Sequence, residues 1–153
     1  MIVFASVLAG CQGNNGSANS SRTSNIEIIA NEVDVEKFLK ASEVVYDRIW
    51  VPSAKDVPTS SELVTILRKH VGNDYQMDSK LSTEIGKMAV RYHWKVSGLV
   101  VNGVKYLIVQ GLCWRDTVAL GKFGRIPDGG VCTIEFVLEC DTRTVLRFTR
   151  NPG

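Results

Sequence analysis

Cysteine is the residue type in this 153-residue chain whose spacing allows the most specific chemistry. The four cysteines are Cys11, Cys113, Cys132 and Cys140. The last two fall on one expected strand, where their separation spans about 26 Å, far beyond the roughly 6 Å between the Cα atoms of a disulfide. If residues 104–114 and 131–140 pair as antiparallel strands, Cys113 lies near Cys132 and Cys140 lies near Lys105. The sequence therefore predicts a Cys113–Cys132 disulfide. The alternative is three reduced cysteines, at 113, 132 and 140, that are buried as small hydrophobic side chains.

Basic side chains on one strand face are the second candidate for chemistry, here the binding of anionic groups. Alternation of apolar and polar residues from about residue 84 to 96 predicts a half-buried strand. Its wet face carries Lys87, Arg91, His93 and Lys95. Such a face could meet lipid headgroups, a glycan polymer or an acidic protein. The alternative is an ordinary charged sheet surface, with Glu135 and Glu139 as cross-strand partners.

The segment from Arg115 to Gly130 is rich in glycine and is expected to be a long surface loop. Long loops are often functional. Four residues in or beside it are candidates for contact with a partner: Trp114, Lys122, Phe123 and Arg125. The alternatives are a tryptophan that fills the core and a loop without a role. The segment lacks the spacing of a phosphate-binding loop.

Catalytic and metal-binding patterns are not recognisable in the sequence. His70 falls near the end of an expected helix, and His93 lies between Arg91 and Lys95. Neither histidine has an identifiable catalytic partner, and no Cys/His spacing typical of a metal site occurs. We therefore expect neither enzyme activity nor a cofactor. The formal net charge of +2 is too small to indicate nucleic-acid binding.

The first eleven residues indicate a location. An apolar run from Met1 to Leu8, too short to span a bilayer, is followed by Ala9-Gly10-Cys11. This pattern resembles the lipobox of bacterial lipoprotein signal peptides, although no Lys or Arg precedes Cys11. The resemblance implies cleavage before Cys11 and lipid on its sulfur and on the new amino terminus. The alternative is a buried first strand with an ordinary core cysteine.

The polar tract after Cys11, QGNNGSANSSRTSN, contains almost nothing that can be buried and is expected to be a flexible tether. The resulting division is a signal peptide at 1–10, a lipidated cysteine with its tether at 11–25, and a single α+β domain at 26–153. Residue 12 is Gln rather than Asp, which in the enterobacterial sorting pattern favours the periplasmic face of the outer membrane.

The domain begins with two expected helices. Apolar residues at helical spacing predict the first over 34–50, with Asp34 as its N-cap. A capping box from Thr59 to Glu62 begins the second, over about 60–71.

Four antiparallel strands are expected after the helices. They comprise the strand at about 84–96 with its continuation, a strand over 104–114 after an Asn102-Gly103 hairpin turn, one over 131–140 and one over 145–150. The chain is thus predicted to be α+β, with two N-terminal helices packed on a curved antiparallel sheet of about four strands. This element order resembles the cystatin or NTF2-like class of folds, which implies no function.

Three functions fit these observations. The first is a lipid-anchored envelope protein that acts by binding, as an accessory or structural part of an assembly such as a secretion or conjugation system. The second is a periplasmic inhibitor or immunity protein that inserts the loop at 115–130 into an enzyme. The third is a small enzyme with an NTF2-like pocket.

Overall fold

The computed structural model describes residues 25–73, 79–113, 121–124 and 130–150. The expected signal peptide, the lipid attachment at Cys11 and nearly all of the tether lie outside these residues. Within the described ranges the chain is a mixed α/β structure with three helices and a six-stranded, mostly antiparallel sheet.

The sheet is built around β3 (His93–Val101), β4 (Val104–Leu112) and β5 (Thr133–Glu139), which pair in sequence order as an antiparallel meander. Strand β6 (Val145–Arg150) continues the meander at one side. Two short strands share the other edge of β3, β1 (Ile26–Ile28) in parallel and β2 (Arg48–Trp50) antiparallel. The register places β1 against residues 94–96 and β2 against residues 98–100.

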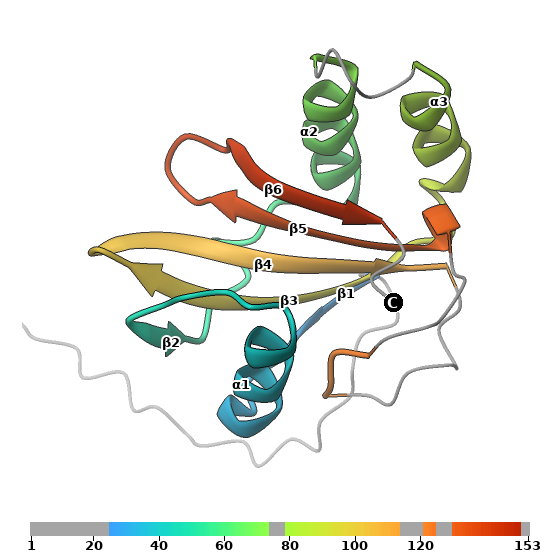
Figure 1. Ribbon diagram of the computed structural model, residues 1–153. Helices are drawn as coiled ribbons and strands as arrows, with labels where there is room; N and C mark the ends of the chain where they lie inside the picture. Colours follow the sequence, from blue (N-terminus) through green and yellow to red (C-terminus); the bar gives the residue numbers. More distant parts are fainter. Residues whose placement is uncertain (1–24, 74–78, 114–120, 125–129, 151–153) are drawn as a thin grey trace, which may run out of the picture.

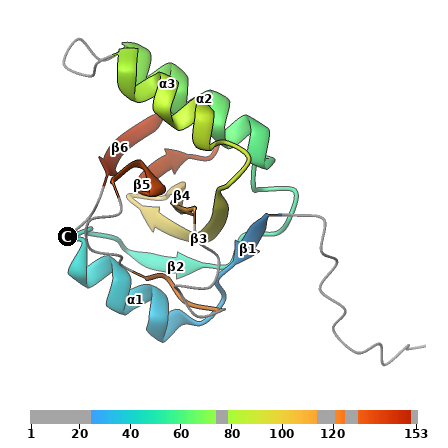
Figure 2. The same ribbon diagram turned by 90° about the vertical axis from the view of Figure 1, so that its right-hand side faces the viewer.

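Helices cover both faces of the sheet. Helices α2 (Ser60–Asn73) and α3 (Ser79–Met88) lie on one face, and α1 (Glu32–Ala41) lies on the other (Figures 1 and 2). The larger core, between the sheet and α2 and α3, includes Trp94 and Phe136, and the smaller core beneath α1 includes Phe38 and Leu99. The expectation of a single helical layer on a sheet of about four strands is therefore corrected to a three-layer arrangement with six strands.

The second face of the sheet also corrects the expected wet strand surface. Lys95 and Glu135, both expected to face solvent, are only 4% and 6% exposed. Alternation with a period of two shows that two faces differ, but it cannot show that the more polar face is uncovered. Here α1 and residues 121–124 cover that face.

The first helix is shorter than predicted. Its N-cap is Asn31, whose Oδ1 accepts hydrogen bonds from the backbone N–H groups of Val33 (3.1 Å) and Asp34 (3.4 Å). The helix ends at Ala41, and Glu43 follows with a φ of 55°. Residues 48–50, expected to continue the helix, form β2 because they hydrogen-bond to the edge of β3.

Residues 79–88 also differ from the prediction, since they form a helix rather than leading into a strand. Leu81 and Ile85 lie one turn apart and are buried against α2. Val90, expected to face inward, is 86% exposed in the turn before β3. The alternation of apolar and polar residues from about residue 84 predicted a strand, but only the part from His93 onward forms β3.

Several local predictions are confirmed. In the capping box of α2, the Thr59 N–H donates to Glu62 Oε2 (2.7 Å) and the Glu62 N–H donates to Thr59 Oγ1 (3.3 Å). Asn102 and Gly103 have positive φ values of 50° and 78°, as a type I′ hairpin requires. The predicted pairing of 104–114 with 131–140 is observed as β4 with β5.

Gly98 is required where β2 meets β3. A Cβ atom there would lie 2.5 Å from the indole ring and the backbone oxygen of Trp50, whose Nε1 donates to the Leu99 carbonyl (3.2 Å). Exposed Gly72, near the end of α2, has nothing within 4 Å of such an atom.

We predict that Gly98→Ala lowers the free energy of unfolding by about 2 kcal/mol or more, because the methyl group must displace β2. Gly72→Ala, the matched control, should raise it by about 0.5–1 kcal/mol, because alanine loses less backbone entropy in a helix. Urea denaturation measures both. Equal changes in the free energy of unfolding for the two substitutions would show that β2 moves away from residue 98 at no energetic cost.

Candidate functional site

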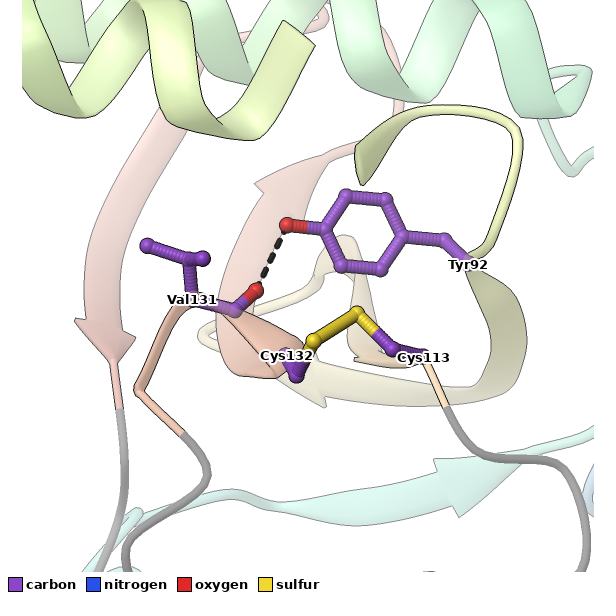
Figure 3. The surroundings of a disulfide bond; sticks show 4 residues. All are labelled: Tyr92, Cys113, Val131 and Cys132. Atoms are coloured by element: carbon purple, nitrogen blue, oxygen red, sulfur yellow. Dashed lines mark hydrogen bonds between the residues drawn. A yellow bond between two sulfur atoms is a disulfide. The ribbon is translucent and has the colours of Figure 1, made fainter. Parts of the chain in front are cut away.

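The Cys113–Cys132 disulfide is present, as predicted from the strand pairing. It joins the residue after β4 to a 3₁₀ turn, η2 (Gly130–Cys132), with a Cα–Cα distance of 4.8 Å. The Cys113 N–H donates to the Cys132 carbonyl at 3.0 Å. Tyr92 lies beside the bridge, and its hydroxyl donates to the Val131 carbonyl at 2.7 Å (Figure 3). Burial raises the pKa of Tyr92, so its phenol remains a hydrogen-bond donor.

Cys140 is the free cysteine among the described residues, and its N–H donates to the Lys105 carbonyl at 3.0 Å. The predicted strand pairing also placed Cys140 at this end of the sheet, near Lys105. Burial raises the pKa of its thiol, which keeps it protonated and a poor nucleophile for exchange with the disulfide.

A row of polar side chains crosses the face of the sheet that α1 covers. Glu27, Lys95, Gln110 and Glu135 occupy successive register positions on β1, β3, β4 and β5. Lys95 Nζ forms an ion pair with Glu27 Oε2 at 3.0 Å, and Gln110 Nε2 donates to Glu135 Oε1 at 2.9 Å. Each charged side chain of this row thus has a partner within the sheet.

Residues 121–124 form a roof over this polar row. The Gly121 N–H donates to Glu27 Oε1, and the Gly124 N–H donates to Gln110 Oε1 at 3.0 Å. Gln110 Nε2 in turn donates to the Gly124 carbonyl. Phe123, a predicted partner contact, instead stacks on Phe38 of α1, with ring centroids 4.4 Å apart. The roof is therefore held at both ends by side chains of the sheet.

Two hydroxyl groups on the same face have no partner among the described residues. They are Ser97 Oγ and Thr133 Oγ1, each in a fully buried residue. A small hollow opens nearby, at the end of α1, beside Glu135, Arg147 and Thr149. Arg147 Nη1 crosses to the Ser42 carbonyl at 2.8 Å and so ties β6 to the end of α1.

The predicted basic strand face does not assemble. Lys87 lies in the last turn of α3, Arg91 lies in the turn that follows, and only His93 and Lys95 lie on β3. Lys95 is paired beneath the roof, whereas Lys122 is exposed in the roof itself. Trp114 and Arg125 lie outside the described residues.

A different cationic site lies between α2 and the β5–β6 turn. Here a groove of about 590 Å³ is lined by Ile66, Lys69, His70, Thr142, Arg143, Thr144 and Val145. Figure 1 shows α2 standing over the side of the sheet that β5 and β6 form. The first three lining residues share one face of α2, because positions three and four apart are neighbours on a helix. We call this the α2–turn groove.

The turn presents its side chains to the groove through a tight backbone. Arg143 adopts a left-handed conformation (φ 56°), and its N–H donates to the Glu139 carbonyl at 3.0 Å. Thr142 Oγ1 accepts the Thr144 N–H at 3.3 Å, so its own hydroxyl hydrogen is available to an acceptor in the groove. Arg143 Nη1 reaches the Asp56 carbonyl at 3.5 Å. The groove is therefore a surface rich in donors and positive charge.

Sequence reasoning missed this groove. It found no catalytic partner for His70 and singled out neither Lys69 nor Arg143 as a candidate for binding. The α2 residues and the turn lie far apart in the sequence, and the three-layer packing brings them together. The adjacent residues Lys69 and His70 were the available signal, but nothing in the sequence indicated that the β5–β6 turn lies beside them.

Metal ligation and membrane spanning were examined for the part of the chain that the structure describes. Within it, no cluster of three or more His, Cys, Asp and Glu residues could hold a metal ion. None of its helices is both long and apolar enough to cross a membrane. The chain matches no protein-family model, no curated protein and no solved structure.

We predict that Cys113→Ala combined with Cys132→Ala lowers the free energy of unfolding by about 3 kcal/mol, because the bridge closes a 19-residue separation. Cys140→Ala should cost less than about 1 kcal/mol, since that thiol is only partly buried. Denaturation with and without dithiothreitol measures these changes in the free energy of unfolding. Reductant should destabilise the wild-type protein and leave the double variant unchanged; a wild-type protein that is insensitive to reductant would contradict the bridge.

We also predict that Gln110→Leu releases the roof. The leucine removes both hydrogen bonds to Gly124 and the bond to Glu135, and we expect a loss of about 1–3 kcal/mol. Amide hydrogen exchange should accelerate at Gly124 while the Leu107 and Val109 amides in the same strand remain protected. Unchanged exchange at Gly124 would show that other contacts hold the roof.

Proposed function

We propose that the chain is a lipid-anchored bacterial envelope protein that acts by binding, as an accessory or structural component of an assembly such as a secretion or conjugation system. The observation that carries this proposal is the Cys113–Cys132 disulfide. Disulfides persist in oxidising compartments such as the periplasm and are rare in the cytosol. The bridge thus supports the destination implied by the sequence at residues 8–11.

The proposed anchor is the lipidated Cys11, and the proposed tether is residues 12–25. A tether of this composition has a root-mean-square span of about 20 Å. Two or more acyl chains give stable membrane attachment, whereas one gives only marginal binding. The folded domain would then work just above the periplasmic face of the outer membrane.

The described residues offer a surface for a partner in such an assembly. The polar row beneath the roof is satisfied largely by its own members, but the α2–turn groove is open and carries exposed cations. A binding role at this groove fits the geometry better than chemistry in the covered row.

A periplasmic inhibitor is the second candidate, and the disulfide favours it as well. The bridge joins Cys113 and Cys132 on either side of the segment expected to insert, and the hydrogen bonds to Glu27 and Gln110 hold residues 121–124 against the sheet. An inhibitor of this kind would form a stoichiometric complex with one enzyme. Isolation of a multi-subunit complex from envelope extracts would instead favour the assembly component.

We predict that Cys11→Ser moves the protein from the membrane fraction to the soluble periplasmic fraction, because the serine cannot carry the thioether-linked lipid. Cys140→Ser is the matched control and should leave the protein in the membrane fraction. Fractionation and metabolic labelling with palmitate measure both effects. Unchanged partitioning of Cys11→Ser would overturn the anchor.

A further inference from the structure

We infer that the α2–turn groove binds an acidic segment of a protein partner, one that places a carboxylate beside an apolar side chain. This inference rests on the proposed binding function and names the ligand of the site. It follows from the charge of the groove lining, from its apolar floor and from its shape.

The described residues that line the groove include Lys69 and Arg143 and no acidic side chain. Lys69 and Arg143 form no ion pair there, and the Glu27–Lys95 pair lies on the opposite face of the sheet. Glu62 lies one turn before Ile66 and is the acidic group nearest in sequence to the α2 lining. Its hydrogen bonds with Thr59 hold its pKa below its usual value and commit its carboxylate to the helix cap, and Arg143 lowers this pKa further. Asp141 precedes Thr142 in the turn and is a second acidic neighbour, but neither carboxylate lines the groove, so the lining itself presents positive charge to a ligand.

The floor of the groove is apolar. Val145 is 6% exposed and belongs to the larger core, and Ile66 packs against that core from α2. The cations and the hydroxyl groups of Thr142 and Thr144 thus surround an apolar floor. A ligand that fills this space must carry an apolar group beside its negative charge. Acidic peptide segments with leucine or valine beside glutamate or aspartate meet this requirement.

The shape of the site favours a peptide over a membrane surface. A volume of about 590 Å³ lies in the range of sites that enclose a small ligand or a few side chains. Anionic bilayers attract clustered basic residues that lie near their plane. Here the cations line a hollow between a helix and a turn, which a narrow protein segment fills more completely than a flat headgroup layer does.

The conformation of Arg143 separates binding from stability. A left-handed conformation costs a residue other than glycine roughly 1–2 kcal/mol. Arg143 is exposed, and its guanidinium donates to the Asp56 carbonyl at 3.5 Å. Glycine adopts this conformation without strain, so Arg143→Gly removes the guanidinium and leaves the backbone of the turn unstrained.

The experiment measures the affinity of the full chain, purified in detergent, for a fluorescent octapeptide of alternating Glu and Leu. Arg143→Gly and Lys69→Gln should each weaken binding about tenfold, because each removes one charge from the site. Glu43→Gly is the control for glycine at a positive φ, and Lys87→Gln is the control for a lysine in the last turn of a helix. Both controls should change the affinity less than about twofold. Arg143→Gly should also unfold at an equal or higher urea concentration than the wild-type protein.

Several results would overturn the inference. These are no binding of the Glu-Leu peptide, equal binding of a Gln-Leu peptide, and equal weakening by Lys87→Gln. Tighter binding to phosphatidylglycerol vesicles, lost in Arg143→Gly, would assign the groove to the membrane. The Cys11→Ser variant should bind the peptide as the wild-type protein does. Failure of the anchor and failure of the groove are therefore distinguishable.

Discussion

The structure depends on the requirement that the charged and amide side chains buried between the sheet and α1 find partners. Helices on opposite faces leave β3, β4 and β5 without a solvent-exposed face. Lys95, Gln110 and Glu135, which an exposed surface would accommodate without cost, are therefore buried. An unpaired charge in such a place costs far more than an exposed one. The ion pair between Lys95 and Glu27 and the hydrogen bonds between Gln110 and Gly124 offset the free energy of burying these side chains. They also fix the position of β1 and of the roof, which no apolar contact could do with the same directionality.

The local signals in the sequence predicted local structure well. The capping box at Thr59, the Asn102-Gly103 turn and the strand pairing that places Cys113 beside Cys132 all depend on residues that are near in sequence or aligned by a hairpin. The predictions were wrong where tertiary contacts determine the secondary structure or the burial of a residue. Residues 48–50 form a strand because an edge of β3 is open to them, and Lys95 is buried because α1 and the roof lie above it. The hydrophobic periodicity of each segment predicts neither outcome.

The candidate site shows the same division. The basic residues singled out from one expected strand are divided between α3, a turn and β3. The α2–turn groove draws its cations from a helix and from a distant turn, whose proximity only the packing of α2 on β5 and β6 establishes. Charge pattern along a sequence predicts which residues are available for binding. The layer arrangement determines which of them can meet the same ligand.

The division of one sheet edge between β1 and β2 has a consequence for self-association. An exposed edge strand is a template for a strand from another molecule, and proteins avoid this with short or interrupted edges. Along β3 the edge is occupied by two three-residue strands of opposite direction. No incoming strand can extend such an edge in a single register, because its hydrogen-bonding pattern changes direction partway along. A domain crowded with its own copies is thereby protected on this side against growth of the sheet from one molecule to the next.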